Sequence, residues 1–286
     1  MGPSLIRTLL AGLLLATSQL ASAESRVFFV IGDTGDCQLP GTEHVARALQ
    51  QQPGWAKATL IEVGDLGYPV ATREQLLGCH EKHFAPFQNR LAIPGNHDWH
   101  AGEQSGFFSV FPGAVPRLEN LGGAWRLLML NSNLRDAAAQ LDWLDRTLAQ
   151  QAGQCLIATW HHPRWSSGKH GDNRFTQPLW ARMQGQASFT LHGHDHHFEA
   201  IPAVDRDGKP SPFGVASFIS GNAGAVLYDP GWGTRRSDRA QYGQWGFMRL
   251  ELDEQQYRWQ AFNVDGKQLD SGKGQCQPAG GRLAPR

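Results

Sequence analysis

Five short polar clusters in the sequence contain the side chains that could do chemistry, and each cluster follows a short apolar run. Their carboxylate, amide, phenol and imidazole groups suit iron, zinc or manganese, whereas soft thiolate sites favour other metals. Two such ions joined by a bridging carboxylate can present a hydroxide to a phosphorus atom. The clusters are Gly32-Asp33-Thr34-Gly35, Gly64-Asp65-Leu66-Gly67-Tyr68, Gly95-Asn96-His97-Asp98, Trp160-His161-His162-Pro163 and Gly193-His194-Asp195-His196.

The elements that must position these clusters can be predicted from the apolar pattern. Short runs rich in β-branched and aromatic residues are typical of buried strands, and apolar residues at helical spacing predict helices between them. Alternating strands and helices imply right-handed crossovers and a largely parallel sheet in the first half of the chain. Ligands bind at the carboxyl ends of such strands, where all five clusters fall. The glycine before Asp33, Asp65, Asn96 and His194 is expected to let the backbone turn tightly. The predicted strands are 27–31, 58–63, 91–94, 127–130, 155–160, 188–191, 215–220, 247–252 and 257–263. The predicted helices are 42–51 with Thr42 as N-cap, 136–151 and part of 72–89.

Taken together, the five clusters in this order resemble the calcineurin-like metallophosphoesterase superfamily. More narrowly, they are similar to the purple acid phosphatases and their bacterial secreted relatives. The resemblance extends from about residue 27 to about residue 225 and includes Ser220-Gly221-Asn222-Ala223-Gly224. It implies an α/β fold of four layers, an α/β/β/α sandwich in which helices flank two central mixed β-sheets.

The same resemblance implies a centre of two metal ions. A free phenol has a pKa near 10, so a tyrosine ligand at neutral pH requires a strongly acidic ion, and Fe³⁺ meets that need. Fe³⁺ is therefore expected at the site that contains Tyr68, with Fe²⁺, Zn²⁺ or Mn²⁺ at the second site. The implied ligands are Asp33, Asp65, Tyr68 and His196 for the first ion, and Asp65, Asn96, His161 and His194 for the second, with Asp65 as the bridge.

Four further residues are candidates for catalysis or substrate binding. His97 is similar to the family histidine that contacts phosphate and protonates the leaving oxygen. Asp98 is expected either to orient His97 or to close the loop, while His162 and His170 are expected to face the substrate. Asp195 should form hydrogen bonds rather than ligate, because it alternates away from its two histidine neighbours in an extended segment. Three tryptophans could wall a substrate cleft, although packing is the favoured interpretation: Trp99, Trp165 and Trp232.

The predicted function is a phosphatase that hydrolyses phosphate monoesters by attack of a metal-bound hydroxide. An alternative is a phosphodiesterase of the same superfamily acting on nucleotides or phospholipid head groups, since the same metals can cleave either bond. Gly35 argues against the cyclic-nucleotide branch, which usually has Asp-x-His at this point. A third hypothesis is a catalytically silent phosphate-binding domain, but all seven ligand positions are intact.

Composition limits the partners of this 286-residue chain. Its 26 basic and 26 acidic residues leave no net charge, which argues against a nucleic-acid scaffold, because phosphate-backbone binding needs a basic surplus. At 41% hydrophobic and 18% charged residues, the chain can bury a sizeable core. A small phosphorylated substrate is the expected partner, and the sequence does not indicate an oligomeric state.

The first 23 residues have the pattern of a signal peptide. Arg7 precedes an apolar stretch over 8–16, and Ala21-Ser22-Ala23 matches a cleavage site. The stretch is too short for a spanning helix, so we expect export to the periplasm or the medium without a stable membrane anchor. An uncleaved N-terminal anchor is the alternative. The expected metallophosphoesterase domain is 24–275, followed by a C-terminal tail over 276–286.

The chain has four cysteines, an even number that favours two disulfides in an exported protein. Three connectivities are possible. The positions of the loops favour Cys37–Cys79, with Cys155–Cys276 tying down the tail. The absence of any C-x-x-C spacing argues against a cysteine zinc site or a redox motif.

Overall fold

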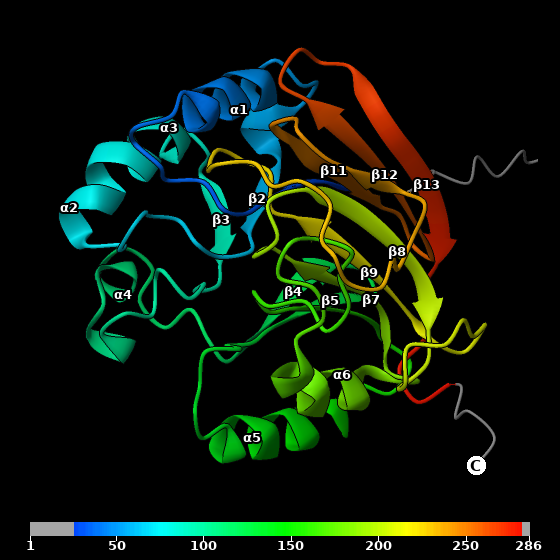
Figure 1. The fold of residues 1–286 in the computed structure, drawn as a ribbon. Helices are drawn as coiled ribbons and strands as arrows, with labels where there is room; N and C mark the ends of the chain where they lie inside the picture. The colour runs from blue at the N-terminus through cyan, green and yellow to red at the C-terminus, as the bar shows by residue number, and fades with distance from the viewer. Residues whose placement is uncertain (1–25, 282–286) are drawn as a thin grey trace, which may run out of the picture.

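The computed structural model of the protein describes residues 26–281, whose strands form two sheets (Figure 1). Strands β1, β2 and β3 pair in parallel in the first sheet, as do β5, β6, β7 and β9 in the second, and the remaining pairs are antiparallel. Both sheets are therefore mixed. The first sheet has the order β13 (Gln268–Gln275), β12 (Gln256–Asn263), β11 (Gly246–Leu252), β1 (Arg26–Ile31), β2 (Thr59–Glu62) and β3 (Asn89–Ala92). The second has the order β10 (Ala240–Gln241), β8 (Phe198–Val204), β9 (Val215–Ser220), β7 (Ala187–His192), β6 (Cys155–Thr159), β5 (Trp125–Met129) and β4 (Arg117–Gly122).

Helices cover the outer face of each sheet, so the molecule has four layers and the predicted α/β/β/α sandwich is confirmed (Figure 1). Apolar residues of α1 and α3 pack on the first sheet, and those of α5 and α6 pack on the second. The helices are α1 (Gly41–Gln50), α2 (Arg73–Gln75), α3 (Lys82–Phe84), α4 (Gly106–Val110), α5 (Ala138–Leu148) and α6 (Gln177–Met183), with a π-helical turn at Leu76–Glu81 and 3₁₀ turns at Trp55–Lys57, Gly102–Gln104 and Arg174–Thr176.

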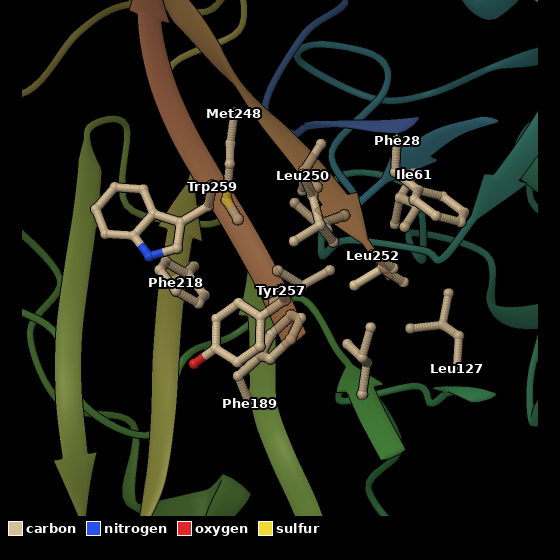
Figure 2. Packing of buried hydrophobic residues seen from close by; sticks show 14 of the residues in the cluster. Phe28, Ile61, Leu127, Phe189, Phe218, Met248, Leu250, Leu252, Tyr257 and Trp259 are labelled. Atoms are coloured by element: carbon tan, nitrogen blue, oxygen red, sulfur yellow. The ribbon is translucent and has the colours of Figure 1, made fainter. Parts of the chain in front are cut away.

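Side chains along a strand point alternately to the two faces of its sheet. One face packs in the inner core between the two sheets, and the other packs in an outer core against the helices. In β1, Phe28 and Val30 face the second sheet, whereas Phe29 and Ile31 face the helices. Figure 2 shows the inner core, where Leu250 and other residues of the first sheet meet aromatic rings of the second. Burying each large apolar side chain contributes about 1.5–3 kcal/mol. The loops at the strand ends therefore extend from a rigid base.

The predicted helices differ from the structure mainly at their ends. The helix expected over 42–51 begins at Gly41, and the prediction of Thr42 as its N-cap is wrong. The hydroxyl of Thr42 instead donates to the carbonyl of Thr34 at 3.0 Å, which ties the helix to the loop after β1. The helix expected over 136–151 is the shorter α5.

The structure pairs Cys37 with Cys79 and Cys155 with Cys276, which confirms the favoured connectivity. The first disulfide joins the loop after β1 to the π-helical turn. Beyond the second disulfide, the amide of Ala279 donates to the carbonyl of Gln154 at 2.8 Å, so the chain remains hydrogen-bonded to the domain. The predicted signal peptide at 1–23 lies outside the described residues. Within 26–281, no helix is long and apolar enough to cross a membrane.

Candidate metal centre

The loops after β1, β2 and β7 bring together the four residues expected around the first ion. The Tyr68 hydroxyl lies 3.0 Å from Oδ1 of Asp33 and 3.1 Å from Oδ2 of Asp65. The same hydroxyl is 3.1 Å from Nε2 of His196, which is itself 3.3 Å from Oδ1 of Asp33. Four potential ligand atoms from three loops thus surround one small volume.

The residues expected around the second ion lie next to the first set. Nε2 of His161 is 3.2 Å from Oδ2 of Asp65, and Nδ1 of His194 is 3.1 Å from Oδ1 of Asn96. The rings of His161 and His194 are 5.3 Å apart. Because one oxygen of Asp65 faces both Tyr68 and His161, this carboxylate has the position that a bridging ligand needs.

Backbone carbonyls orient two of the imidazoles. Nδ1 of His161 donates to the carbonyl of Val63 at 2.8 Å, and Nδ1 of His196 donates to that of Val226 at 2.5 Å. A carbonyl can only accept, so when the ring is neutral the other nitrogen carries the lone pair that a metal needs. Nε2 of His161 is buried, and its contact of 3.2 Å with Oδ2 of Asp65 does not have the geometry of a hydrogen bond. The donor set therefore fits two cations.

Three of the seven expected ligands have a left-handed backbone: φ is +58° at Asp33, +56° at Asp65 and +74° at His194. Such positions cost on the order of 1–3 kcal/mol for most residues and gather at functional sites. Of the glycines that precede the ligands, only Gly64 has a positive φ. The others are required for close approach, since a Cβ on Gly95 would lie 2.0 Å from Oδ1 of Asp65. The expectation that a glycine supplies the tight turn therefore holds at Gly64, whereas at Asp33 and His194 the ligand residue itself adopts the left-handed conformation.

The electrostatics around Asp33 and Asp65 favour added positive charge. Burial would lower the pKa of His161, but Asp65 and then Asp33 raise it to about 9. Conversely, burial would raise the pKa of Asp65, but His161 holds it well below the ordinary carboxyl value. Burial, Asp33 and Asp65 raise the pKa of Tyr68 well above 10, so its deprotonation requires a cation nearby. Burial and the neighbouring His161 lower the pKa of His194, which keeps this imidazole neutral and able to ligate.

His97 lies at the edge of the centre. Its Nδ1 donates to the carbonyl of Pro69 at 2.6 Å, and its Nε2 is 4.0 Å from Oδ2 of Asp65. Asp98 is buried and accepts from the amides of Leu66 at 3.0 Å and Gly95 at 2.9 Å. Of the two roles expected for Asp98, the structure therefore favours closing the loops over orienting His97, whose ring is held by Pro69.

The two expected substrate residues flank His194. The His162 ring lies 4.4 Å from that of His194, and its Nδ1 is 2.8 Å from the Ser132 hydroxyl. The His170 ring also lies 4.4 Å from that of His194, and its backbone amide donates to Asp195 at 2.8 Å. The prediction that Asp195 forms hydrogen bonds is confirmed, and both histidines border the second set of ligands.

Two neighbours of the centre were not predicted. Tyr228 stacks on His196 with ring centroids 4.0 Å apart and planes within 8°, and Ser132 contacts His162. Neither residue belongs to a motif, so only the folded chain reveals them. Packing was the favoured role for three tryptophans. Trp165 is buried, which confirms packing for this residue. Trp232 is fully exposed, so the prediction that it packs is wrong.

The sequence model of the calcineurin-like phosphoesterases matches residues 24–198, more than half of the chain. The chain belongs to this family. Membership supports a phosphoester hydrolase and implies a binuclear metal centre, as the clusters at the strand ends indicated. A comparison with curated protein sequences finds no significant match.

Three solved structures share the fold at low sequence identity. A purple acid phosphatase, PPD1, from yellow lupin (Lupinus luteus) seeds is 15% identical with a TM-score of 0.67, over 87% of this chain but only 53% of its own. GAP50, the anchor in the inner membrane complex of Plasmodium, is 14% identical with a TM-score of 0.72, over 90% of both chains. PhoD is 10% identical with a TM-score of 0.63, over 90% of this chain and 71% of its own. The chain thus spans about half the length of the lupin enzyme.

Proposed function

We propose that the protein is an exported phosphatase that hydrolyses phosphate monoesters at a centre of two metal ions. The observation that carries the proposal is the position of Asp65, whose Oδ2 lies about 3 Å from both the Tyr68 hydroxyl and His161 Nε2. Two ligand sets that share one carboxylate suit a pair of ions. In this proposal Asp33, Asp65, Tyr68 and His196 hold the first ion, and Asp65, Asn96, His161 and His194 hold the second.

The chain's own residues bind the ester and move the proton. When bound, two such ions supply Lewis acidity and lower the pKa of water to near neutrality. His162 and His170 border the second ligand set and would bind the phosphate group. His97 is the proton donor to the departing alcohol, because the Pro69 carbonyl fixes its Nδ1 and leaves Nε2 on the side of the centre.

Tyr68 supports iron in the first site. Its raised pKa means that only a strongly acidic cation would deprotonate it near neutral pH, and Fe³⁺ satisfies that condition better than Zn²⁺ or Mn²⁺. Protein purified without added metal should show a visible tyrosinate-to-iron absorption band that Tyr68→Phe abolishes. A colourless, fully active wild type that contains only zinc or manganese would refute iron and leave the phosphatase proposal intact.

Two alternatives remain testable beside the monoesterase. A phosphodiesterase would use the same ligands, so only its substrates distinguish it. GAP50 is described as an anchor, and its similar fold supports comparison with a silent domain. The complete ligand set and the strained Asp33, Asp65 and His194 favour a working centre.

Export is supported by the two disulfides, which persist in oxidising compartments, and by the signal-peptide pattern at 1–23. The proposed partner is a small phosphorylated molecule rather than nucleic acid, since the chain has no basic surplus. No stable membrane anchor is expected after cleavage. Detecting the processed chain in a periplasmic or culture fraction tests this part directly.

The decisive experiment measures metal content and turnover of the processed protein on monoesters, diesters and nucleotides. His97→Ala should retain both ions yet slow esters with poor leaving groups by about 10²–10⁴-fold, with a much smaller effect on nitrophenyl phosphate, whose leaving group needs no proton. An equal loss on both ester types would remove His97 from the acid role. Two bound metals without turnover on any ester would favour the silent domain.

A further inference from the structure

A cavity of about 400 Å³ lies between residues of the loops that follow β3 and β5 and is bordered mainly by apolar side chains. This volume is within the range of small-molecule sites, about 300–1,000 Å³. Trp99, Phe108, Val115 and Leu134 line it and are all only partly buried. Phe108 and Val115 also pack against buried core residues, so they form a firm apolar wall. Partly buried apolar side chains that gather around an open hollow are typical of a binding site.

The loops after β3 and β5 link this cavity to the centre. Trp99 comes two residues after His97 on the first loop. On the second, Asn131 lines the cavity and immediately precedes Ser132, whose hydroxyl contacts His162. A hydrogen bond of 3.1 Å from the Asn133 side chain to the Pro94 carbonyl joins the two loops. The cavity therefore borders the loop that carries His97 and the loop whose Ser132 contacts His162.

The polar residues of the cavity are already engaged with each other. Gln140 accepts from the amide of Asn131 and donates to its carbonyl, both at 2.8 Å. Oδ1 of Asn131 accepts from the backbone and the side chain of Asn133, both at 2.9 Å. The acceptor oxygens of these two side chains are thus occupied, whereas the side-chain nitrogen of Asn131 keeps its donors. The apolar part of the lining suits a group that needs no hydrogen bond.

Aromatic rings form part of the cavity wall. The rings of Trp99 and Phe108 meet edge to face at 5.7 Å, and Pro112 and Pro116 complete the lining. Aromatic rings pair well in such arrangements and add binding energy beyond simple burial. A larger cavity of about 880 Å³, which Arg26 and Lys57 line, lies at the amino ends of β1 and β2 and therefore away from an ester at the carboxyl ends.

We propose that the cavity lined by Trp99, Phe108, Val115 and Leu134 binds the aromatic alcohol part of the substrate. The inference rests on the proposed phosphatase function and narrows its substrate class to aryl or aryl-bearing phosphate monoesters. A larger apolar ring should raise kcat/KM, since removing more apolar surface from water strengthens binding.

The test compares 2-naphthyl phosphate with phenyl phosphate, whose leaving groups have similar acidity. We expect the wild type to prefer the naphthyl ester about tenfold in kcat/KM, mainly through KM. Leu134→Trp places a larger side chain in the cavity and should reduce that preference to about twofold or less. Leu77→Trp is the matched control, because Leu77 is also an exposed leucine but lies on the π-helical turn, outside the cavity lining. It should leave both rates unchanged.

Binding of 2-naphthol, measured by saturation-transfer NMR on the metal-loaded protein, separates failure of this proposal from failure of the phosphatase function. If both esters are hydrolysed but the naphthyl-to-phenyl ratio of kcat/KM is the same in the wild type and in Leu134→Trp, the aryl site is overturned and the phosphatase function stands. Absence of hydrolysis would overturn the phosphatase. Loss of naphthol binding in Leu134→Trp alone would still support the cavity as an aryl site, and equal binding by all three proteins would reject it.

Discussion

The two sheets contribute chemically different halves to the candidate centre. Loops of the first sheet supply oxygen atoms only, from two carboxylates, a phenol and an amide. Loops of the second supply imidazole nitrogens only. The oxygen half comprises Asp33, Asp65, Tyr68 and Asn96, and the imidazole half comprises His161, His194 and His196.

The supports of the two halves differ as well. Behind the oxygen half, the Thr34 hydroxyl contacts His80 at 2.8 Å, His80 contacts Glu62 at 2.7 Å, and Arg90 binds Glu62 at 2.9 Å. In the imidazole half, His161 and His196 are oriented by neutral backbone carbonyls. The oxygen half thus depends on balanced charge, whereas the imidazole half depends on hydrogen bonds that the backbone provides.

The difference predicts unequal consequences when a ligand is removed. Asp65→Asn should abolish binding of both ions and lower kcat/KM more than about a thousandfold. Losing a residue that only hydrogen-bonds to a metal ligand already costs about 10–100-fold, and a shared ligand should cost more. His161→Asn, in the imidazole half, should lose mainly one ion. Metal analysis by mass spectrometry and turnover of the same samples measure both effects. If Asp65→Asn retains two ions per chain, the shared carboxylate is not the bridge.

The buried charges behind the oxygen half predict a large effect on stability. Arg90→Met leaves Glu62 charged and buried, which should lower the free energy of unfolding by about 3–5 kcal/mol. Adding Glu62→Gln should recover most of that loss. Arg182→Met is the matched control, because Arg182 pairs with the exposed Asp145 and should cost less than about 1 kcal/mol. Urea unfolding of the wild type, Arg90→Met, the double variant and Arg182→Met measures these differences. A double variant no more stable than Arg90→Met would contradict the idea that Arg90 balances the charge of Glu62.

The same pair gives the pH dependence a definite sign. Burial would raise the pKa of Glu62, but Arg90 and then His80 lower it below its ordinary value of 4.5. A carboxyl whose pKa is lowered on folding stabilises the protein above its unfolded value and loses that contribution as the pH falls through the folded pKa. The stability advantage of the wild type over Glu62→Gln should therefore shrink as the pH falls from 6 to 3.

Much of the fold follows from local pattern, and its exceptions have physical causes. Four of the five strands before the clusters are buried apolar runs, so β1, β2, β6 and β7 were predictable. The fifth, β3, is less buried and begins at Asn89, before the predicted range of 91–94. Strand β13 was not predictable, because its residues alternate with glycine and charge at a sheet edge, where burial demands little. Strand β8 was also missed, because it follows the last cluster without an intervening helix.

For the site, sequence motifs indicate which residues gather but not what supports them. The clusters predicted the ligands at the strand ends, and the structure brings those side chains together. The carbonyls of Val63 and Val226 and the ring of Tyr228 act through position alone. Any residue could supply such a carbonyl, so no residue type marks these positions in the sequence.

Tyr228 offers the finest test of how the imidazole half is held. The Tyr228 ring stacks on His196, and Nζ of Lys169 lies 4.4 Å from the Tyr228 ring centroid. The loop that carries Tyr228 therefore supports His196, a proposed ligand of the first ion. An aromatic pair contributes about 0.5–1.5 kcal/mol, so Tyr228→Leu should weaken retention of that ion about two- to tenfold, while Tyr228→Phe keeps the ring and should change it little. Chelator titration of the loaded proteins measures the retention. The Val226 carbonyl would still hold the other nitrogen of His196 in both variants, which is why the effect should be smaller than that of losing any ligand. Equal retention in the leucine and phenylalanine variants would show that the carbonyl alone orients His196.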